Sequence, residues 1–313
     1  MEHSAHDKIK TLRENLEKVV RGKKGVIDLA IATLLARGHL LIEDAPGVGK
    51  TTLAHALARS ISCSFQRIQF TSDLLPSDVL GVTIYNQAKL SFEFKPGPIF
   101  ANIVLADEIN RATPKTQSAL LEAMNDRQVS VEKETLPLPS PFMLLATQNP
   151  LEYSGTFPLP ESQLDRFTMR IKIGYPDEAV EREIIQSPPD ALLPENLSPV
   201  VSAGEVIRLQ EQVDKVRVEE ELVNYIIKIA AITRKRKSLR LGVSPRGTMC
   251  LYRAAQAMAM VEGRDYCIPD DIKRLAVPVF AHRVIPVEYG MEGDAGDTDV
   301  LMEEVLKGVR VPI

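Results

Sequence analysis

The chain has 313 residues and a net charge of −4 at neutral pH, a length typical of two domains. Its isoelectric point near 5.9 excludes the strong basic field by which many proteins hold nucleic acid. With 44% hydrophobic and 26% charged residues, the composition is that of a globular protein. Three cysteines without a CxxC pair make neither a disulfide framework nor a zinc site. No apolar run reaches the roughly 18 residues of a membrane span, and the N-terminus does not have the pattern of a signal peptide, so we expect a cytoplasmic protein without membrane insertion.

Hydrophobic periodicity predicts two amphipathic helices at the start of the chain, over 9–20 and 26–36, with Gly38 as a stop signal. Helical patterns recur further on, at 52–60 and 114–125. Short continuous apolar runs, each typical of a strand buried on both faces, lie at 40–42, 68–70, 99–106, 142–146 and 167–173. Buried strands that alternate with helices predict an α/β fold with a parallel sheet covered on both faces.

Two intervals break this alternation. Residues 72–94 form an insertion with a predicted hairpin, and alternating side chains at 128–138 predict a second hairpin. Pro, Ser and Asn are frequent at 187–199, which indicates a linker. Beyond it the strand signals largely stop while helical spacing continues. We therefore expect a core over 1–186, a linker over 187–200 and a smaller, all-helical domain over 201–313.

A glycine-rich loop follows the predicted strand at 40–42 and leads directly into a helix, which is the context of a phosphate-binding loop. Glycines let consecutive N–H groups turn inward around phosphates, and the helix N-terminus adds partial positive charge. Lys50 would reach the β- and γ-phosphates of ATP, and the Thr51 hydroxyl would be a ligand of Mg²⁺. Asp44 stands where the full motif has its first glycine, and the alternative is a glycine turn that only caps a helix. The residues predicted to bind the nucleotide are Pro46, Gly47, Val48, Gly49, Lys50, Thr51 and Thr52.

Polar residues end two of the other apolar runs. Asp107 and Glu108 follow one run at the carboxyl edge of the predicted sheet, where ligands of such folds bind. Asp107 would hold Mg²⁺ through water, and Glu108 would polarise the attacking water. Taken alone, such an acid pair is more often the start of a helix. Asn149 follows the run at 142–146, where it would touch the γ-phosphate or the water, or would begin an Asn-Pro turn.

Together these segments resemble the AAA+ ATPases and, within them, the MoxR family. The resemblance runs from about residue 20 to the C-terminus. The segment after Phe70 and the match at 107–112 are specific to the family, whereas the phosphate loop is shared by all P-loop NTPases. The matching segments are PGVGKT at 46–51, QFTSDLLPSD at 69–78, ADEINRA at 106–112, ATQNP at 146–150, PESQLDRF at 160–167 and SPRG at 244–247.

The resemblance implies a P-loop AAA+ αβα core with a parallel sheet, followed by a helical lid. It implies that Arg166 is an arginine finger inserted into a neighbouring subunit's nucleotide site, that Arg246 is the second sensor, which reaches from the helical lid to the bound phosphates, and that Asn149 is the first sensor. The insertion and the second hairpin would face a substrate or a central pore. For the two arginines the alternative is a surface side chain at a helix end. The region that contacts adenine would contain Val20, Arg21 and Gly22.

An arginine that acts on a neighbour requires assembly, so we expect a homo-oligomer, a hexameric ring, that hydrolyses ATP with Mg²⁺. The family implies chaperone-like remodelling or maturation of a protein client, with a von Willebrand factor A domain partner on a separate chain. A metal-chelatase motor subunit is one alternative, and a DNA-remodelling or helicase-like motor is another. The basic run at 234–237 is the strongest hint of nucleic acid, but the negative net charge disfavours such a partner. A nucleotide-gated scaffold without turnover is a further alternative, against which Glu108, Asn149 and Arg166 argue.

Overall fold

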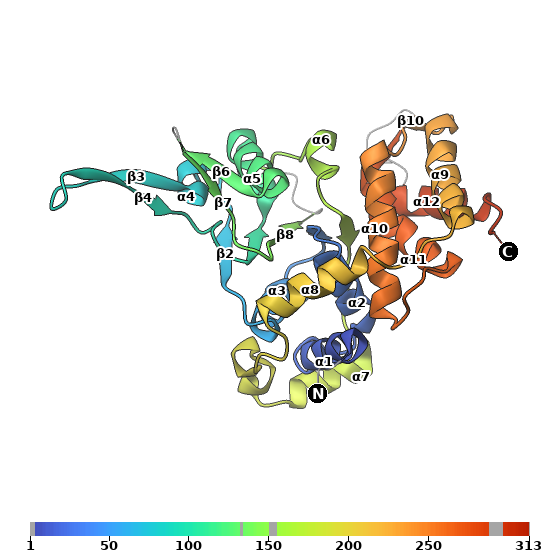
Figure 1. Cartoon of the computed structure of the whole chain (residues 1–313), viewed down its shortest axis with the longest axis horizontal. Helices are drawn as coiled ribbons and strands as arrows, with labels where there is room; N and C mark the ends of the chain where they lie inside the picture. Colours follow the sequence, from blue (N-terminus) through green and yellow to red (C-terminus); the bar gives the residue numbers. More distant parts are fainter. Residues whose placement is uncertain (1–3, 132–133, 150–154, 288–296, 313) are drawn as a thin grey trace.

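A five-stranded parallel sheet forms the centre of the first half of the chain (Figure 1). The computed structural model describes residues 4–131, 134–149, 155–287 and 297–312. The sheet has the order β2-β5-β8-β1-β9, and every pair of neighbours is parallel, as predicted. Its strands are β1 (Leu40–Glu43), β2 (Phe65–Gln69), β5 (Ile103–Asp107), β8 (Met143–Gln148) and β9 (Met169–Ile171).

Consecutive residues of the central strands point to opposite faces of the sheet and reach two separate cores. Ile103 and Leu105 of β5 belong to the core on one face, and Val104 and Ala106 to the core on the other. This is the arrangement that a continuous apolar run predicts. One face is covered by α1 (Ala5–Glu17), α2 (Lys24–Leu35) and α3 (Lys50–Ser60), and the other by α5 (Pro114–Asp126). The predicted αβα layering is therefore present.

The edge strand β2 differs from the prediction of a strand buried on both faces. It begins at Phe65, before the apolar run at 68–70, and only Ile68 among its residues is buried. Because β2 has a sheet neighbour on one side alone, its polar side chains stay in solvent. Residues 99–102 of another apolar run precede β5 and are not part of it. Apolar runs thus located the strands but not their limits.

Both predicted hairpins are present. After β2 the chain forms the short helix α4 (Pro76–Leu80) and then β3 (Gly81–Asn86) and β4 (Ser91–Pro96), an antiparallel pair that projects from the body of the molecule (Figure 1). At its root, a Cβ on Gly81 would lie 2.4 Å from the Lys95 carbonyl oxygen, so only glycine permits this close approach. The second pair, β6 (Gln128–Val131) and β7 (Glu134–Pro137), follows α5.

The chain beyond β9 is helical, with 3₁₀ turns in the region of the predicted linker. One addition to the predicted helical domain is a small antiparallel pair, β10 (Leu239–Leu241) with β11 (Ile285–Pro286). The short α6 (Glu161–Leu164) lies between β8 and β9. The later helices are α7 (Glu178–Gln186), α8 (Ala203–Val213), α9 (Glu220–Lys235), α10 (Pro245–Val261), α11 (Pro269–Phe280) and α12 (Thr298–Lys307).

Helices α8 and α10 pack against α2, and residues of all three belong to one hydrophobic core. Within this contact the Gln210 side-chain amide donates a hydrogen bond of 2.7 Å to the Leu34 carbonyl at the end of α2. The later helices are thereby fixed to the first face of the sheet. In the part of the chain that the structure describes, no helix is long and apolar enough to cross a membrane.

Candidate active site

The loop between β1 and α3 has the backbone geometry of a phosphate cradle. Gly47 and Gly49 have φ angles of +83° and +94°, a region that favours glycine. Apart from the adjacent residues of the loop, no atom of the described part of the chain lies within 4 Å of the Cβ position of either glycine, so the conformation and not crowding requires glycine there. Gly49 is the N-cap of α3, which begins at Lys50. The helix N-terminus therefore adds its partial positive charge to the loop.

Asp44, the departure from the full motif, fixes the loop to the end of the sheet. Its Oδ2 accepts hydrogen bonds of 2.6 Å from the backbone N–H groups of both Ile173 and Gly174, just after β9. Its Oδ1 accepts one of 2.8 Å from the Ala45 N–H. The Lys50 ammonium donates a hydrogen bond of 2.8 Å to the Asp44 carbonyl oxygen and so lies over the loop. A glycine at this position could make none of the carboxylate contacts.

One threonine connects the two acidic residues. The Thr147 hydroxyl on β8 donates a 2.6 Å hydrogen bond to Oδ1 of Asp107, and it accepts a 2.9 Å bond from the Glu108 N–H. Asp107 ends β5 and is only 8% exposed. Glu108 has a φ of +57°, the left-handed region that costs a non-glycine residue about 1–3 kcal/mol. Thr147 thus holds a strained turn that places both carboxylates at the carboxyl edge of the sheet.

Two polar residues of β2 complete this cluster, and neither was predicted from the sequence. Arg67 donates to Oδ2 of Asp107 from Nη2 at 2.6 Å and from Nε at 3.1 Å. The Gln69 amide donates a hydrogen bond of 2.9 Å to Oε2 of Glu108, and the same oxygen lies 3.2 Å from Nε of Arg111. Gln69 stands at the start of the matching segment 69–78, but no role was assigned to it. Residues 67 and 69 share one face of β2 and pair in register with β5, which the sequence did not show.

Asn149 and the predicted adenine region lie around the same end of the sheet. Asn149 follows β8 and is buried, while Pro150 of its motif lies outside the described residues. Val20 is buried, and Arg21 donates a hydrogen bond of 3.1 Å to the Ser187 hydroxyl oxygen. Gly22 has a φ of +69°, and a Cβ there would lie 2.7 Å from the Val180 side chain of α7. Residues 20–22 therefore pack against the segment that follows β9, and their contact with adenine stays a prediction.

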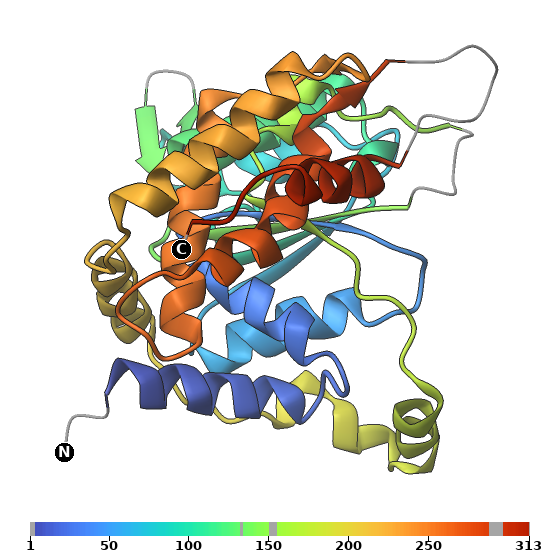
Figure 2. The ribbon, with the colours of Figure 1, turned by 90° about the vertical axis from the view of Figure 1, so that its right-hand side faces the viewer.

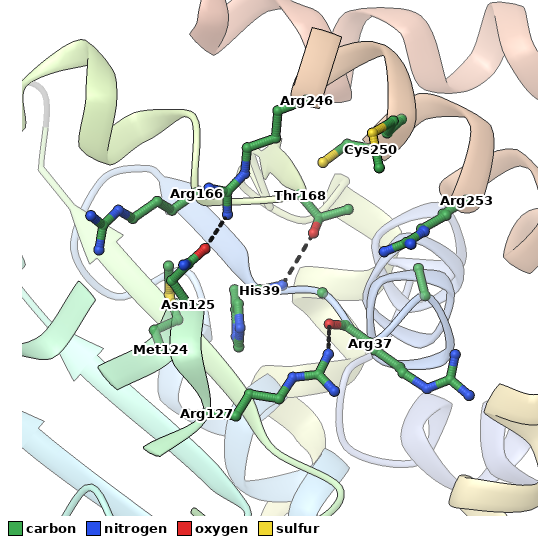
Figure 3. A pocket seen from close by; sticks show the side chains of 13 residues that line it. Arg37, His39, Met124, Asn125, Arg127, Arg166, Thr168, Arg246, Cys250 and Arg253 are labelled. Carbon is green, nitrogen blue, oxygen red and sulfur yellow. Dashed lines mark hydrogen bonds between the residues drawn. The ribbon is translucent and has the colours of Figure 1, made fainter. Parts of the chain in front are cut away.

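Arg166 and Arg246 lie at the other end of the sheet. Both line a cavity with His39, which precedes β1, whereas Lys50 follows β1 (Figure 3). The Asp165 carboxylate accepts a 3.1 Å bond from the Ser244 hydroxyl, which fixes the N-terminus of α10 next to Arg166. Arg246 in turn donates a hydrogen bond of 2.7 Å to Oδ1 of Asn125. Neither arginine reaches the phosphate loop of its own chain.

The two ends of the sheet thus hold different chemical groups. One end has a lysine and backbone donors suited to phosphates, and carboxylates suited to a divalent cation and to proton transfer. Residues 39–169 match the family described as ATPase family associated with various cellular activities (AAA), and residues 231–305 match the AAA lid domain. The chain is 40% identical to Chaperone MoxR1 of Mycobacterium tuberculosis, over 95% of this chain and 80% of that protein. It belongs to the MoxR family of AAA+ ATPases.

Two other relatives match along nearly the whole chain. It is 48% identical to the uncharacterized protein YeaC of Bacillus subtilis, over 96% of this chain and 93% of the relative. A crystal structure from Cytophaga hutchinsonii superposes with a TM-score of 0.89 at 39% identity, and covers 99% of this chain and 96% of that one. The predicted AAA+ core with a helical lid is confirmed, and ATP hydrolysis is the activity of this family member.

Proposed function

We propose that the chain is a Mg²⁺-dependent ATPase motor whose active sites form between neighbouring copies and which remodels partner proteins. The observation that carries this proposal is the separation of Arg166 from Lys50 at opposite ends of β1. Figure 2 shows that the two regions lie on opposite sides of the molecule. The loop after β1 (blue) is at the right edge, and the β6–β7 pair (green), which directly follows Arg127 of the cavity, is at the left. A head-to-tail arrangement brings one end against the other.

The residues at the carboxyl end fit a complex of ATP and Mg²⁺. The space over Gly47 and Gly49 is open, and the Lys50 ammonium is directed to the same loop. Thr51 and Asp107 supply oxygen donors of the kind that Mg²⁺ prefers, and both would hold the ion. The bound ion would neutralise charge on the phosphates during transfer. The N–H groups from 46 to 52 would hold the phosphate oxygens, with Lys50 at the β- and γ-phosphates.

Glu108 would accept the proton of the attacking water on its carboxylate. Its hydrogen bond from Gln69 and the nearby Arg111 orient this carboxylate at the edge of the sheet. Asn149, which emerges from the adjacent strand β8, would orient the same water or touch the γ-phosphate. Arg166 and Arg246 would bind the γ-phosphate of the neighbour's nucleotide, as an arginine finger and a second sensor.

Copies that contact one another head to tail form a closed ring when their successive rotations add up to a full turn, and we expect a ring of six copies. The name of the relative Chaperone MoxR1 supports a chaperone-like role with protein clients. The projecting β3–β4 hairpin, with Tyr85 half exposed and Phe92 74% exposed, offers an apolar surface to such a client. A separate von Willebrand factor A domain protein stays a prediction for the partner. The net charge of −4 disfavours a DNA motor.

Complementation between two inactive variants tests the shared site. Lys50→Ala removes nucleotide binding but keeps Arg166, and Arg166→Ala keeps the nucleotide site but lacks the finger. Each variant alone should be inactive, whereas an equimolar mixture should regain about a quarter of the wild-type ATP turnover, because one interface in four then combines both intact halves. A mixture no more active than its components would overturn the proposal. Arg208→Ala, an exposed arginine of α8, is the matched control and should keep full activity.

A further inference from the structure

The cavity that contains Arg166 and Arg246 is lined by five arginines. It has a volume of about 260 Å³ and lies between the core and the lid helix α10. Arg127 and Arg166 come from the core, Arg246 and Arg253 come from α10, and Arg37 comes from the turn after α2 (Figure 3). No acidic residue is among the described residues that line it. Such a concentration of one charge in a cleft creates a strong positive potential.

Only one of the five arginines has a carboxylate partner. Arg37 forms an ion pair of 2.8 Å with Asp214, whereas for the other four the described residues provide no carboxylate within 4.0 Å. Arg127 donates instead to the Arg37 carbonyl, and Arg246 donates to Asn125. The nearest acidic residue in sequence to Arg166 is already engaged, since Asp165 accepts from Arg283 at 2.8 Å and from Ser244. Four guanidinium groups therefore retain uncompensated charge.

The surroundings of Arg127 make its positive charge unfavourable in the absence of an anion. Burial lowers the pKa of Arg127, and the charges of Arg37 and Arg253 lower it further. His39 is buried beside them, and its Nδ1 accepts a 3.0 Å hydrogen bond from the Leu144 N–H, so the ring is neutral and does not compensate the arginines. Guanidinium groups bind phosphate oxygens in a bidentate manner, and a tetrahedral phosphate is the anion that several of them can share.

We propose that this cavity is a phosphate site, in which Arg127 and Arg253 act together with Arg246 and Arg166. The site binds the terminal phosphate of the neighbouring subunit's nucleotide, and in this respect it rests on the proposed function. Because Arg127 belongs to the core and Arg253 to the lid, the bound phosphate bridges the two. Its release leaves the positive charge of Arg127 on the core and those of Arg246 and Arg253 on the lid without an anion between them, and their repulsion opens the angle between core and lid. Loss of phosphate in one subunit thereby changes the shape of the next.

Cys250 provides a direct readout of occupancy, because it also lines the cavity and is partly exposed. The other two thiols react slowly, since burial raises the pKa of Cys63 to about 11 and that of Cys267 to about 12. The rate at which a thiol reagent modifies Cys250 in the full chain, measured on the Cys250 peptide by mass spectrometry, therefore reports whether the cavity is filled.

Two arms distinguish the source of the phosphate. In the first, wild-type protein receives a non-hydrolysable ATP analogue with Mg²⁺, and Cys250 should react at least about tenfold more slowly. This protection should disappear in Lys50→Ala, which binds no nucleotide. In the second arm, Lys50→Ala receives inorganic tripolyphosphate. Protection of Cys250 in this arm, if lost when Arg127→Ala is added to Lys50→Ala, would show that the cavity binds phosphate from solution. This conclusion would hold even if ATP turnover did not depend on a neighbouring subunit.

Variants of the newly assigned arginines decide the proposal. Arg127→Ala and Arg253→Ala should each need about tenfold or more ligand for half-maximal protection, since a hydrogen bond to a charged group contributes about 1.5–3 kcal/mol. Arg208→Ala should leave the protection unchanged. If Cys250 is protected equally in Arg127→Ala, Arg253→Ala and wild type, the neighbour merely covers the cavity and the proposal is wrong. The proposal is equally wrong if neither ligand protects Cys250. Sedimentation of each variant shows that it still folds and assembles.

Discussion

At the carboxyl end of the sheet, the two acidic residues have donors from β2 and β8, whereas at the amino end four arginines lack a carboxylate partner among the described residues. The first end is a complete network in one chain, with Asp107 held by Arg67 and Thr147. The second end is left with excess positive charge. We therefore expect the carboxyl end to bind nucleotide by itself and the amino end to need an anion from outside. Single substitutions can therefore separate nucleotide binding, which needs only the carboxyl end of the sheet, from ATP turnover, which needs both ends.

The largest effect is expected at the phosphate loop. Lys50→Ala removes the ammonium over the loop, and ATP binding should weaken by more than about a hundredfold with no detectable turnover. A fluorescent ATP analogue measures the binding. Lys228→Ala, an exposed lysine of α9, serves as the control and should bind normally. Retained binding in Lys50→Ala would mean that the loop is not the nucleotide site.

Glu108→Gln should separate binding from chemistry. The amide keeps the size of the side chain but cannot accept the proton, so turnover should fall by about 10²–10⁴ while ATP affinity stays near that of the wild type. Phosphate release under saturating ATP gives the rate, and equilibrium binding gives the affinity. Unchanged turnover would remove Glu108 from the reaction and favour a nucleotide-gated scaffold.

Thr147 is a positioning residue, so its loss should have a smaller effect. Thr147→Val deletes the hydroxyl that joins Asp107 to the Glu108 N–H, and we expect kcat to fall by about tenfold with a smaller change in KM. Thr147→Ser keeps the hydroxyl and should restore most of the rate. A serine variant as slow as the valine variant would show that packing of the methyl group, and not the hydrogen bonds, matters.

The smallest effect concerns stability at the amino end. Burial, together with Arg127 and Arg246, lowers the pKa of His39 to about 3, and protonation of Nδ1 would also break its bond from Leu144. Between pH 6.5 and 3 the unfolded chain therefore takes up a proton that the folded chain does not. The free energy of unfolding should fall as the pH falls, with His39 contributing at most about 1.4 kcal/mol per pH unit.

His39→Gln, which keeps an acceptor but cannot titrate, should make this dependence shallower. Denaturant unfolding at pH 6 and pH 5 measures the slope for both proteins. Buried His282, whose pKa is also held well below its usual range by burial and Arg283, keeps part of the dependence in the variant. Equal slopes in the two proteins would contradict a neutral, buried His39.

Local patterns predicted the elements whose cause is local. A phosphate loop could be predicted because its glycines, Lys50 and Thr51 are contiguous, and the two hairpins because alternation is a short-range property. Even the departure at Asp44 was visible, but its reason was not, since the carboxylate binds the backbone at 173–174 after β9. The same holds for Arg67 and Gln69, which meet Asp107 and Glu108 only through the register of β2 with β5.

The sequence by itself determined the fold class and the family, and it predicted a nucleotide loop and an acidic pair, because these depend on composition, periodicity and short contiguous motifs. Only the tertiary structure decided which end of the sheet each arginine occupies. Arg127 and Arg166 are far in sequence from each other and from Arg246 and Arg253 of α10, and the four share one cavity because α10 packs on α2 and Asp165 binds Ser244. Chain topology sets this arrangement, and no local pattern encodes it.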